Sequence, residues 1–96
     1  MFRASNDADA IYYNAIECFR TAIECAKKVN SRSEYLEDHY SNKFLADIYN
    51  NLGVAYSELK EYVKAKESFD TALELNSNFG LAKHNKSLTA QKIDTR

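Results

Sequence analysis

The stretch that decides the fold is residues 46–79, ADIYNNLGVAYSELKEYVKAKESFDTALELNSNF. The first half of this stretch carries residues at the spacing i, i+3, i+4, i+7, which is typical of one face of an amphipathic helix. These residues are Tyr49, Leu52, Gly53 and Tyr56. A glycine inside a helix costs about 1 kcal/mol relative to alanine. Gly53 therefore predicts a place where another backbone comes very close.

The second half of the stretch predicts another helix after a short turn at Lys60 and Glu61. Ala65, Phe69 and Ala72 are four and three positions apart, which keeps them on one helix face. The small alanines at both ends let a neighbouring helix approach, and the aromatic ring between them fills the gap. The stretch is thus expected to form a tightly packed helical hairpin.

The second helix of this hairpin has a copy earlier in the chain. Residues 12–26, YYNAIECFRTAIECA, align with residues 62–76, YVKAKESFDTALELN, with seven of fifteen positions identical. The copy places Ala15, Phe19 and Ala22 at the spacing of the later packing stripe. The chain therefore contains an internal repeat.

Residues 46–79 resemble a tetratricopeptide repeat, a helix–turn–helix unit of about 34 residues. The residues that carry the resemblance are Tyr49, Leu52, Gly53, Tyr56, Ala65, Phe69 and Ala72. Two positions depart from the family pattern, since Tyr49 stands where tryptophan is common and Ser77 stands where proline is expected. The resemblance implies an all-α stack of antiparallel helices that serves as a protein–protein interaction scaffold.

We expect a single domain, 1–96, of about four helices, at 7–29, 33–59, 62–75 and 79–94. The first is the second helix of a partial repeat, because its own first helix has no counterpart upstream. The next two form the full repeat. The motif copies are 50 positions apart rather than 34, so the first hairpin should be lengthened. The last helix is interpreted as a polar capping helix.

The composition argues against nucleic acid and membranes as partners. Thirteen basic and fourteen acidic residues leave a net charge of −1, which argues against nucleic acid as a partner. No apolar run is long enough for a membrane span. Cys18 and Cys25 are seven residues apart on one helix, too far for a disulfide. We interpret them as small packing residues of a cytoplasmic protein.

No enzyme signature is present, and neither a cofactor nor a metal is expected. The histidines, His39 and His84, fall on different helices without a catalytic or metal-binding motif. The expected partner is a protein or peptide in the concave groove lined by the first helices of the repeats. Groove residues are predicted on the helices at 33–59 and 79–94: Asp47, Asn50, Asn51, Val54, Ser57, Glu58, Leu81, His84, Asn85 and Leu88.

Two other functions remain open. Ala15, Phe19 and Ala22 lack their usual partner helix, so either the helix at 33–59 covers them or another chain does, which predicts self-association or insertion into a larger repeat array. The resemblance also suggests co-chaperones that grip the C-terminal peptide of heat-shock chaperones. Asn51 matches their carboxylate clamp, but Leu81 and Asn85 stand where lysine and arginine are needed.

Overall fold

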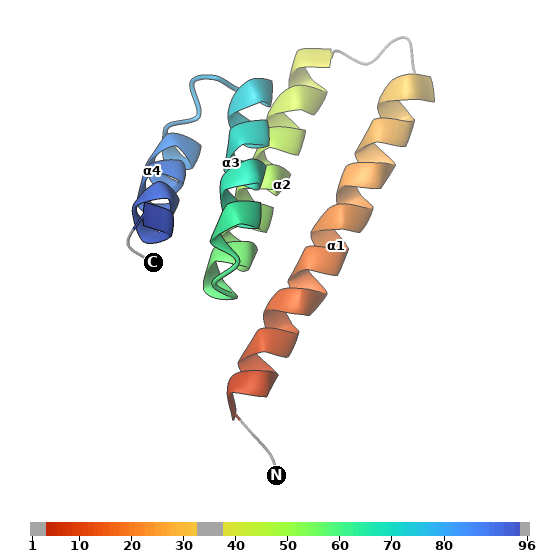
Figure 1. Cartoon of the computed structure of the whole chain (residues 1–96). Coiled ribbons are helices and arrows are strands. Elements are labelled where there is room, and N and C mark those ends of the chain that lie inside the picture. The colour runs from red at the N-terminus through yellow and green to blue at the C-terminus, as the bar shows by residue number, and fades with distance from the viewer. Residues whose placement is uncertain (1–3, 33–37, 95–96) are drawn as a thin grey trace.

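The chain folds into four α-helices. The computed structural model describes residues 4–32 and 38–94, and within them the side chains of residues 9–28 and 42–94. The helices are α1 (Ala4–Arg32), α2 (Asp38–Glu58), α3 (Tyr62–Leu75) and α4 (Gly80–Asp94). Each runs antiparallel to the preceding one, so α2 and α4 are parallel to each other (Figure 1). The predicted all-α stack is confirmed.

The first hairpin is the longest part of the stack. α1 has 29 residues and extends beyond the expected 7–29 at both ends, whereas α3 has only 14. The N-terminal end of α1 reaches past the ends of the other helices (Figure 1). The predicted helical segment at 33–37 lies outside the described residues.

The centre of the repeat is the contact between Gly53 on α2 and Phe69 on α3. Phe69 is only 1% exposed, and Gly53 is buried. A Cβ atom added at Gly53 would lie 2.5, 2.7 and 2.8 Å from three atoms of the Phe69 ring. The ring thus occupies the space that any larger residue would need. The close approach at Gly53 is made by this side chain and not, as the sequence predicts, by another backbone. Full burial of such a ring contributes roughly 1.5–3 kcal/mol.

Small residues also set the contacts among α2, α3 and α4. Ala46, Ala72 and Ala82 come from these three helices, form one cluster and are each 0% exposed. Because alanine carries a single methyl group, the helix axes can come close together without leaving a void. α4 is held in this way against both helices of the repeat.

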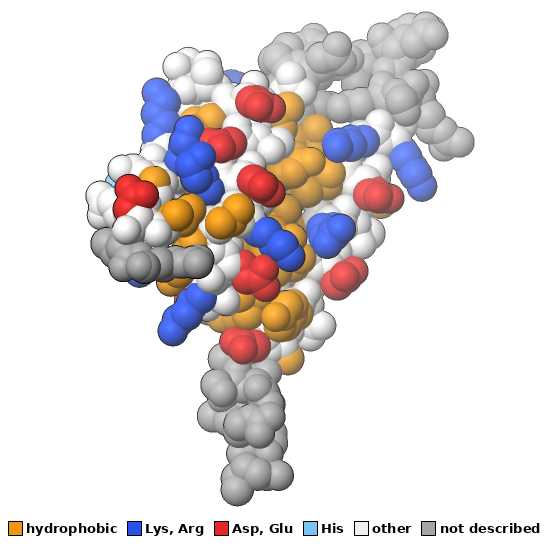
Figure 2. Space-filling model, in the orientation of Figure 1, with side chains coloured by type: hydrophobic (Ala, Val, Ile, Leu, Met, Phe, Trp, Pro, Cys, Tyr) orange, Lys and Arg blue, Asp and Glu red, His pale blue; other side chains and the backbone are white. Residues whose placement is uncertain are grey.

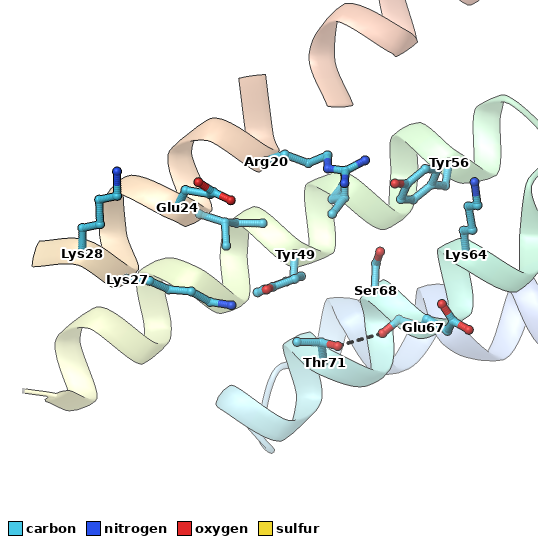
Figure 3. Close-up of a pocket in the computed structure, with 12 residues that line it drawn as sticks. Arg20, Glu24, Lys27, Lys28, Tyr49, Tyr56, Lys64, Glu67, Ser68 and Thr71 are labelled. Carbon is cyan, nitrogen blue, oxygen red and sulfur yellow. Dashed lines mark hydrogen bonds between the residues drawn. The ribbon is translucent and has the colours of Figure 1, made fainter. Parts of the chain in front are cut away.

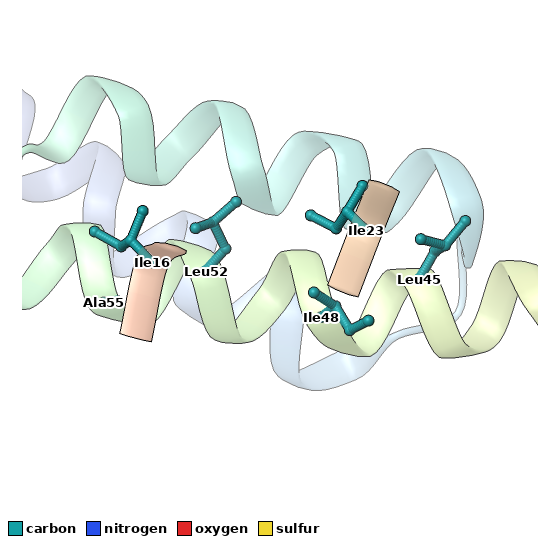
Figure 4. Packing of buried hydrophobic residues seen from close by; sticks show 6 residues of the cluster. All are labelled: Ile16, Ile23, Leu45, Ile48, Leu52 and Ala55. Atoms are coloured by element: carbon teal, nitrogen blue, oxygen red, sulfur yellow. The ribbon is translucent and has the colours of Figure 1, made fainter. Parts of the chain in front are cut away.

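A separate core joins α1 to α2, the only helix of the described residues that α1 contacts. Ile16 and Ile23 of α1 meet Leu45, Ile48 and Leu52 of α2 (Figure 4). Their spacings of seven, three and four follow the helical period, as is typical of amphipathic helices. α1 is therefore attached through one face only, and its other faces stay open.

The turn after α2 requires an unusual backbone conformation at Lys60. Its φ is 63°, in the left-handed region, although it is not a glycine. The N–H of Glu61 donates to the carbonyl of Tyr56, and the N–H of Lys60 donates to that of Ser57, both at 2.9 Å. This pair of bonds defines a Schellman motif, in which glycine normally takes the position of Lys60. The turn is therefore well bonded but strained at one residue.

The interpretation of the cysteines as packing residues is wrong. Cys18 and Cys25 are both exposed and form no disulfide. Ile16 and Ile23, two positions earlier in each case, point toward α2 instead. Because two residues span about 200° of helix rotation, the cysteines lie on the side of α1 away from the core.

Candidate functional site

Exposed side chains line the two parallel helices α2 and α4 along adjacent faces. Asp47, Asn51, Val54 and Glu58 are exposed on α2, and Leu81, His84 and Leu88 are exposed on α4. The spacing of these positions keeps each set on one helix face. We call these seven residues, together with Ser57 and Asn85, the α2–α4 surface. The sequence predicted all nine as groove residues.

Part of the α2–α4 surface is hollowed. Val54, Ser57 and Glu58 of α2 and Asn85 and Leu88 of α4 line a cavity of about 170 Å³. The Phe69 ring, Thr89 and Lys92 complete its lining. The structure thus brings together five of the ten predicted groove residues around one hollow.

Asn50 is the exception among the predicted groove residues. It is 2% exposed, so its expected position on an open face is corrected. The side-chain amide of Asn85 donates a hydrogen bond of 3.1 Å to Asn50 Oδ1. Asn50 therefore ties α2 to α4 and is not free to bind a peptide. Its burial has a physical reason, since an amide in a helix interface is stable only when another polar group pairs with it.

An ion-paired carboxylate fixes α4 on its other side. Asp70 of α3 lies 2.8 Å from Lys86 Nζ of α4 and 3.3 Å from Lys66 Nζ of its own helix. Partial burial acts to raise the pKa of Asp70, but the hydrogen bonds and positive charges of the two lysines outweigh it, so the pKa is lower than usual. The carboxylate is ionised at neutral pH and helps to hold α4 in register.

A second hollow lies on the opposite side of α2, between α1 and α3. These two helices do not contact each other within the described residues. A cavity of about 720 Å³ lies between them, and residues of α2 also line it. Hydrophobic side chains gather between the two helices, with charged side chains on both sides (Figure 2). We call this hollow the α1–α3 groove. Its lining residues are Arg20, Ile23, Glu24, Lys27 and Lys28 of α1, Tyr49, Leu52 and Tyr56 of α2, and Lys64, Glu67, Ser68 and Thr71 of α3 (Figure 3).

The sequence does not predict this groove. Tyr49 and Tyr56 belong to the predicted packing stripe, and both are partly buried against the α1–α2 core. Their remaining exposed parts contribute to the floor of the groove. The period of the stripe could not reveal this, because it does not indicate how far apart α1 and α3 lie.

The predicted self-association stripe is partly covered within the chain. Phe19 and Ala22 are partly buried against the core between α1 and α2, and Ala15 is likewise partly buried. α2 therefore covers some of this face, one of the two solutions expected from the sequence. Ile11, on the same helix, is 65% exposed.

The described residues show neither a metal-binding cluster nor a helix that could span a membrane. They contain no group of three or more His, Cys, Asp or Glu side chains placed to hold a metal ion. In the same ranges, no helix combines the length and the apolar character that crossing a bilayer requires.

A stack of helical hairpins with open, mixed-polarity faces defines the class of helical-repeat proteins. In the comparison with protein families, residues 46–79 match the tetratricopeptide repeat. This repeat generally mediates protein–protein interaction and is typically non-catalytic, and no catalytic domain is identified. No curated protein and no solved structure matches the chain significantly.

Proposed function

We propose that the chain is a protein-interaction module that binds a segment of a partner protein along the α2–α4 surface. In this proposal residues 1–96 act as one domain, with α1 as the second helix of a partial repeat and α4 as the capping helix. The module works in the cytoplasm, a reducing compartment in which the exposed thiols of Cys18 and Cys25 stay free.

One observation carries the proposal. Val54, Leu81 and Leu88 are 39%, 56% and 44% exposed, and all three lie on adjacent faces of two packed helices. Exposed apolar side chains that gather on one surface favour a docking site over random exposure. Asn51 beside them is exposed and offers both a donor and an acceptor to a peptide backbone. The surface thus combines apolar anchors with a group that can orient a chain.

The test compares two exposed valines. Val54 lies on the α2–α4 surface, whereas Val63, 55% exposed, lies on α3 and lines neither hollow. We expect Val54→Asp to abolish capture of partner proteins from source lysate and Val63→Asp to retain it, with both variants folded by circular dichroism. Equal capture by the two variants would refute the proposed site.

Assembly with another repeat is a second candidate function. Ile11 of α1 and Phe44 of α2 are 65% and 50% exposed, although both are large and hydrophobic. A helix from another molecule, packed beside the stripe of Ala15, Phe19 and Ala22, would cover such side chains. Sedimentation equilibrium tests this alternative, because it predicts a dimer or larger assembly that Ile11→Asp dissociates. A monomer at high concentration rejects self-association.

A co-chaperone function has less support. The carboxylate clamp that the resemblance suggests needs cationic side chains on the last helix. Leu81 is apolar, and Asn85 is neutral and already donates to Asn50. A peptide ending in carboxylates would therefore lack its charge-assisted bonds at these positions.

A further inference from the structure

The α1–α3 groove has an apolar floor with a helical period. Tyr49 and Tyr56 are seven residues apart on α2, which places them about 10.5 Å apart along the helix axis. Both rings are partly buried and so are held in place, but each keeps an exposed part facing the groove. Tyrosine is a frequent anchor in interfaces because its ring offers a large contact area at little conformational cost.

On the α1 side of the groove, cationic side chains recur at the same spacing along the helix. Arg20 and Lys27 are also seven residues apart, and both are exposed. The ion pairs found among the described side chains involve neither of them. Across the groove, Lys64 lies 3.3 Å from Glu61 and 5.8 Å from the centre of the Tyr56 ring, so its charge is already engaged. The available positive charge is therefore concentrated on the α1 side.

The lining as a whole is positive, although the chain as a whole is not. Four cationic side chains line the groove against two anionic ones, Glu24 and Glu67, whereas the full chain has a net charge of −1. A ligand with carboxylates beside α1 would complement this charge.

The walls of the groove favour a helix over an extended peptide as the occupant. α1, α2 and α3 are helical along the groove, so their backbone N–H and C=O groups are already bonded within each helix. An extended peptide would lay its own unpaired backbone groups over the tyrosine rings, which is costly. A helix satisfies its backbone internally and presents only side chains.

We propose that the α1–α3 groove binds an amphipathic helix of a partner protein. The apolar face of that helix places large side chains two turns apart on Tyr49 and Tyr56. Its acidic flank places carboxylates two turns apart beside Arg20 and Lys27. This site lies on the opposite side of α2 from the α2–α4 surface and does not depend on it.

Helix α4 of a second copy of this chain does not fit the groove. α4 presents Leu81 and Leu88 at the same two-turn spacing, and both are exposed. However, α4 also carries Lys83, Lys86 and Lys92, and its only acidic residue is Asp94 at its end. Docking this helix would bring lysines against the cationic rim of α1, which like-charge repulsion disfavours.

The experiment uses the full chain and two synthetic helices of about three heptads. Both peptides have leucines at the a and d positions, one with glutamates and the other with lysines beside the leucine face. Fluorescence anisotropy should show that the glutamate peptide binds about tenfold more tightly than the lysine peptide, from two exposed charge pairs. The double variant Arg20→Glu/Lys27→Glu should reverse this preference.

A matched pair of variants tests the position of the peptide. Thr71 lines the groove, whereas Thr21 is exposed on α1 and lines a different, smaller hollow. Thr71→Arg fills the groove without reducing its positive charge, so it should weaken binding of the glutamate peptide by about tenfold or more. Thr21→Arg should leave this binding unchanged, as should Val54→Asp on the other side of α2. Thermal unfolding of each variant verifies that it is folded.

Four results would overturn the proposal. The first is equal affinity for the two peptides, and the second is undiminished binding by folded Thr71→Arg. The third is that a glutamate peptide whose helix is broken by central prolines binds as tightly as the intact glutamate peptide, because this would indicate an extended ligand. The fourth is a dimer of the free chain that Thr71→Arg dissociates, because it would make a second copy the occupant.

Discussion

Replacement of Gly53 by alanine tests the packing on which the repeat depends. The added Cβ would lie within 2.8 Å of three atoms of the Phe69 ring, and this ring is 1% exposed. Alanine gains about 1 kcal/mol of helix propensity over glycine. Forcing the buried ring aside costs about 1–3 kcal/mol. The strain should exceed the gain, because three atoms of an almost fully buried ring would have to move away from the new Cβ.

We therefore expect Gly53→Ala to lower the free energy of unfolding by up to about 2 kcal/mol and the Tm by up to about 16 °C. Urea denaturation followed by circular dichroism measures this change. Gly80→Ala is the matched control, because a Cβ atom at Gly80 meets nothing within 4 Å. This second substitution should be neutral or slightly stabilising.

A double-mutant cycle identifies the contact responsible. Phe69→Leu removes the ring atoms that the Cβ added by Gly53→Ala would meet, although it destabilises the chain by itself. In this background Gly53→Ala should cost much less than in the native chain. The reasoning is refuted if Gly53→Ala stabilises the native chain, or if its cost is the same in both backgrounds.

Three further predictions concern the turn and the attachment of α4. Lys60→Gly should raise the free energy of unfolding by about 1 kcal/mol in urea denaturation, because glycine adopts the left-handed φ of 63° without strain; an unchanged or lower value argues against strain there. Asn50→Ala should lower the free energy of unfolding by about 1–2 kcal/mol, because the side-chain amide of Asn85 loses its acceptor. It should also speed hydrogen exchange of the backbone amides in α4, and unchanged exchange contradicts this. The pKa of Asp70 is lowered in the folded chain, so its ion pairs contribute fully above about pH 4 and are lost as the pH falls below that value. Because Asp70 and Lys86 are partly exposed, the free energy of unfolding should fall by no more than about 1 kcal/mol between pH 6 and pH 3 on this account. Urea denaturation at the two pH values measures this fall, and Asp70→Asn should make it smaller.

The repeat could be predicted from the sequence because its determinants are local. The spacing of Tyr49, Leu52 and Gly53 defines a helix face whatever the rest of the chain does. A close approach at Gly53 could also be predicted, since an interior glycine is costly. The sequence did not show that the neighbour is the Phe69 ring and not a backbone. Most of the α2–α4 surface followed from the same period, which puts Asn51 and Val54 opposite the packing stripe.

The remaining features depend on the distances between helices, and the helical spacing of residues in the sequence does not determine these distances. Asn50 is adjacent to Asn51 and equally polar, and only the position of α4 makes it buried. The Cys18 and Cys25 pair shares one face, but the sequence does not show which face meets α2. The α1–α3 groove exists because α1 contacts α2 alone among the described helices, which no residue pattern within α1 or α3 indicates.

The most direct test of the proposed function is site-specific photo-crosslinking in the source cells. Benzoylphenylalanine replaces either Leu88, on the α2–α4 surface, or Val63, on α3; both side chains are exposed, at 44% and 55%. The account predicts that position 88 forms covalent adducts with a partner protein on irradiation and that position 63 does not. Adducts of equal yield from both positions, or from position 63 alone, would contradict it.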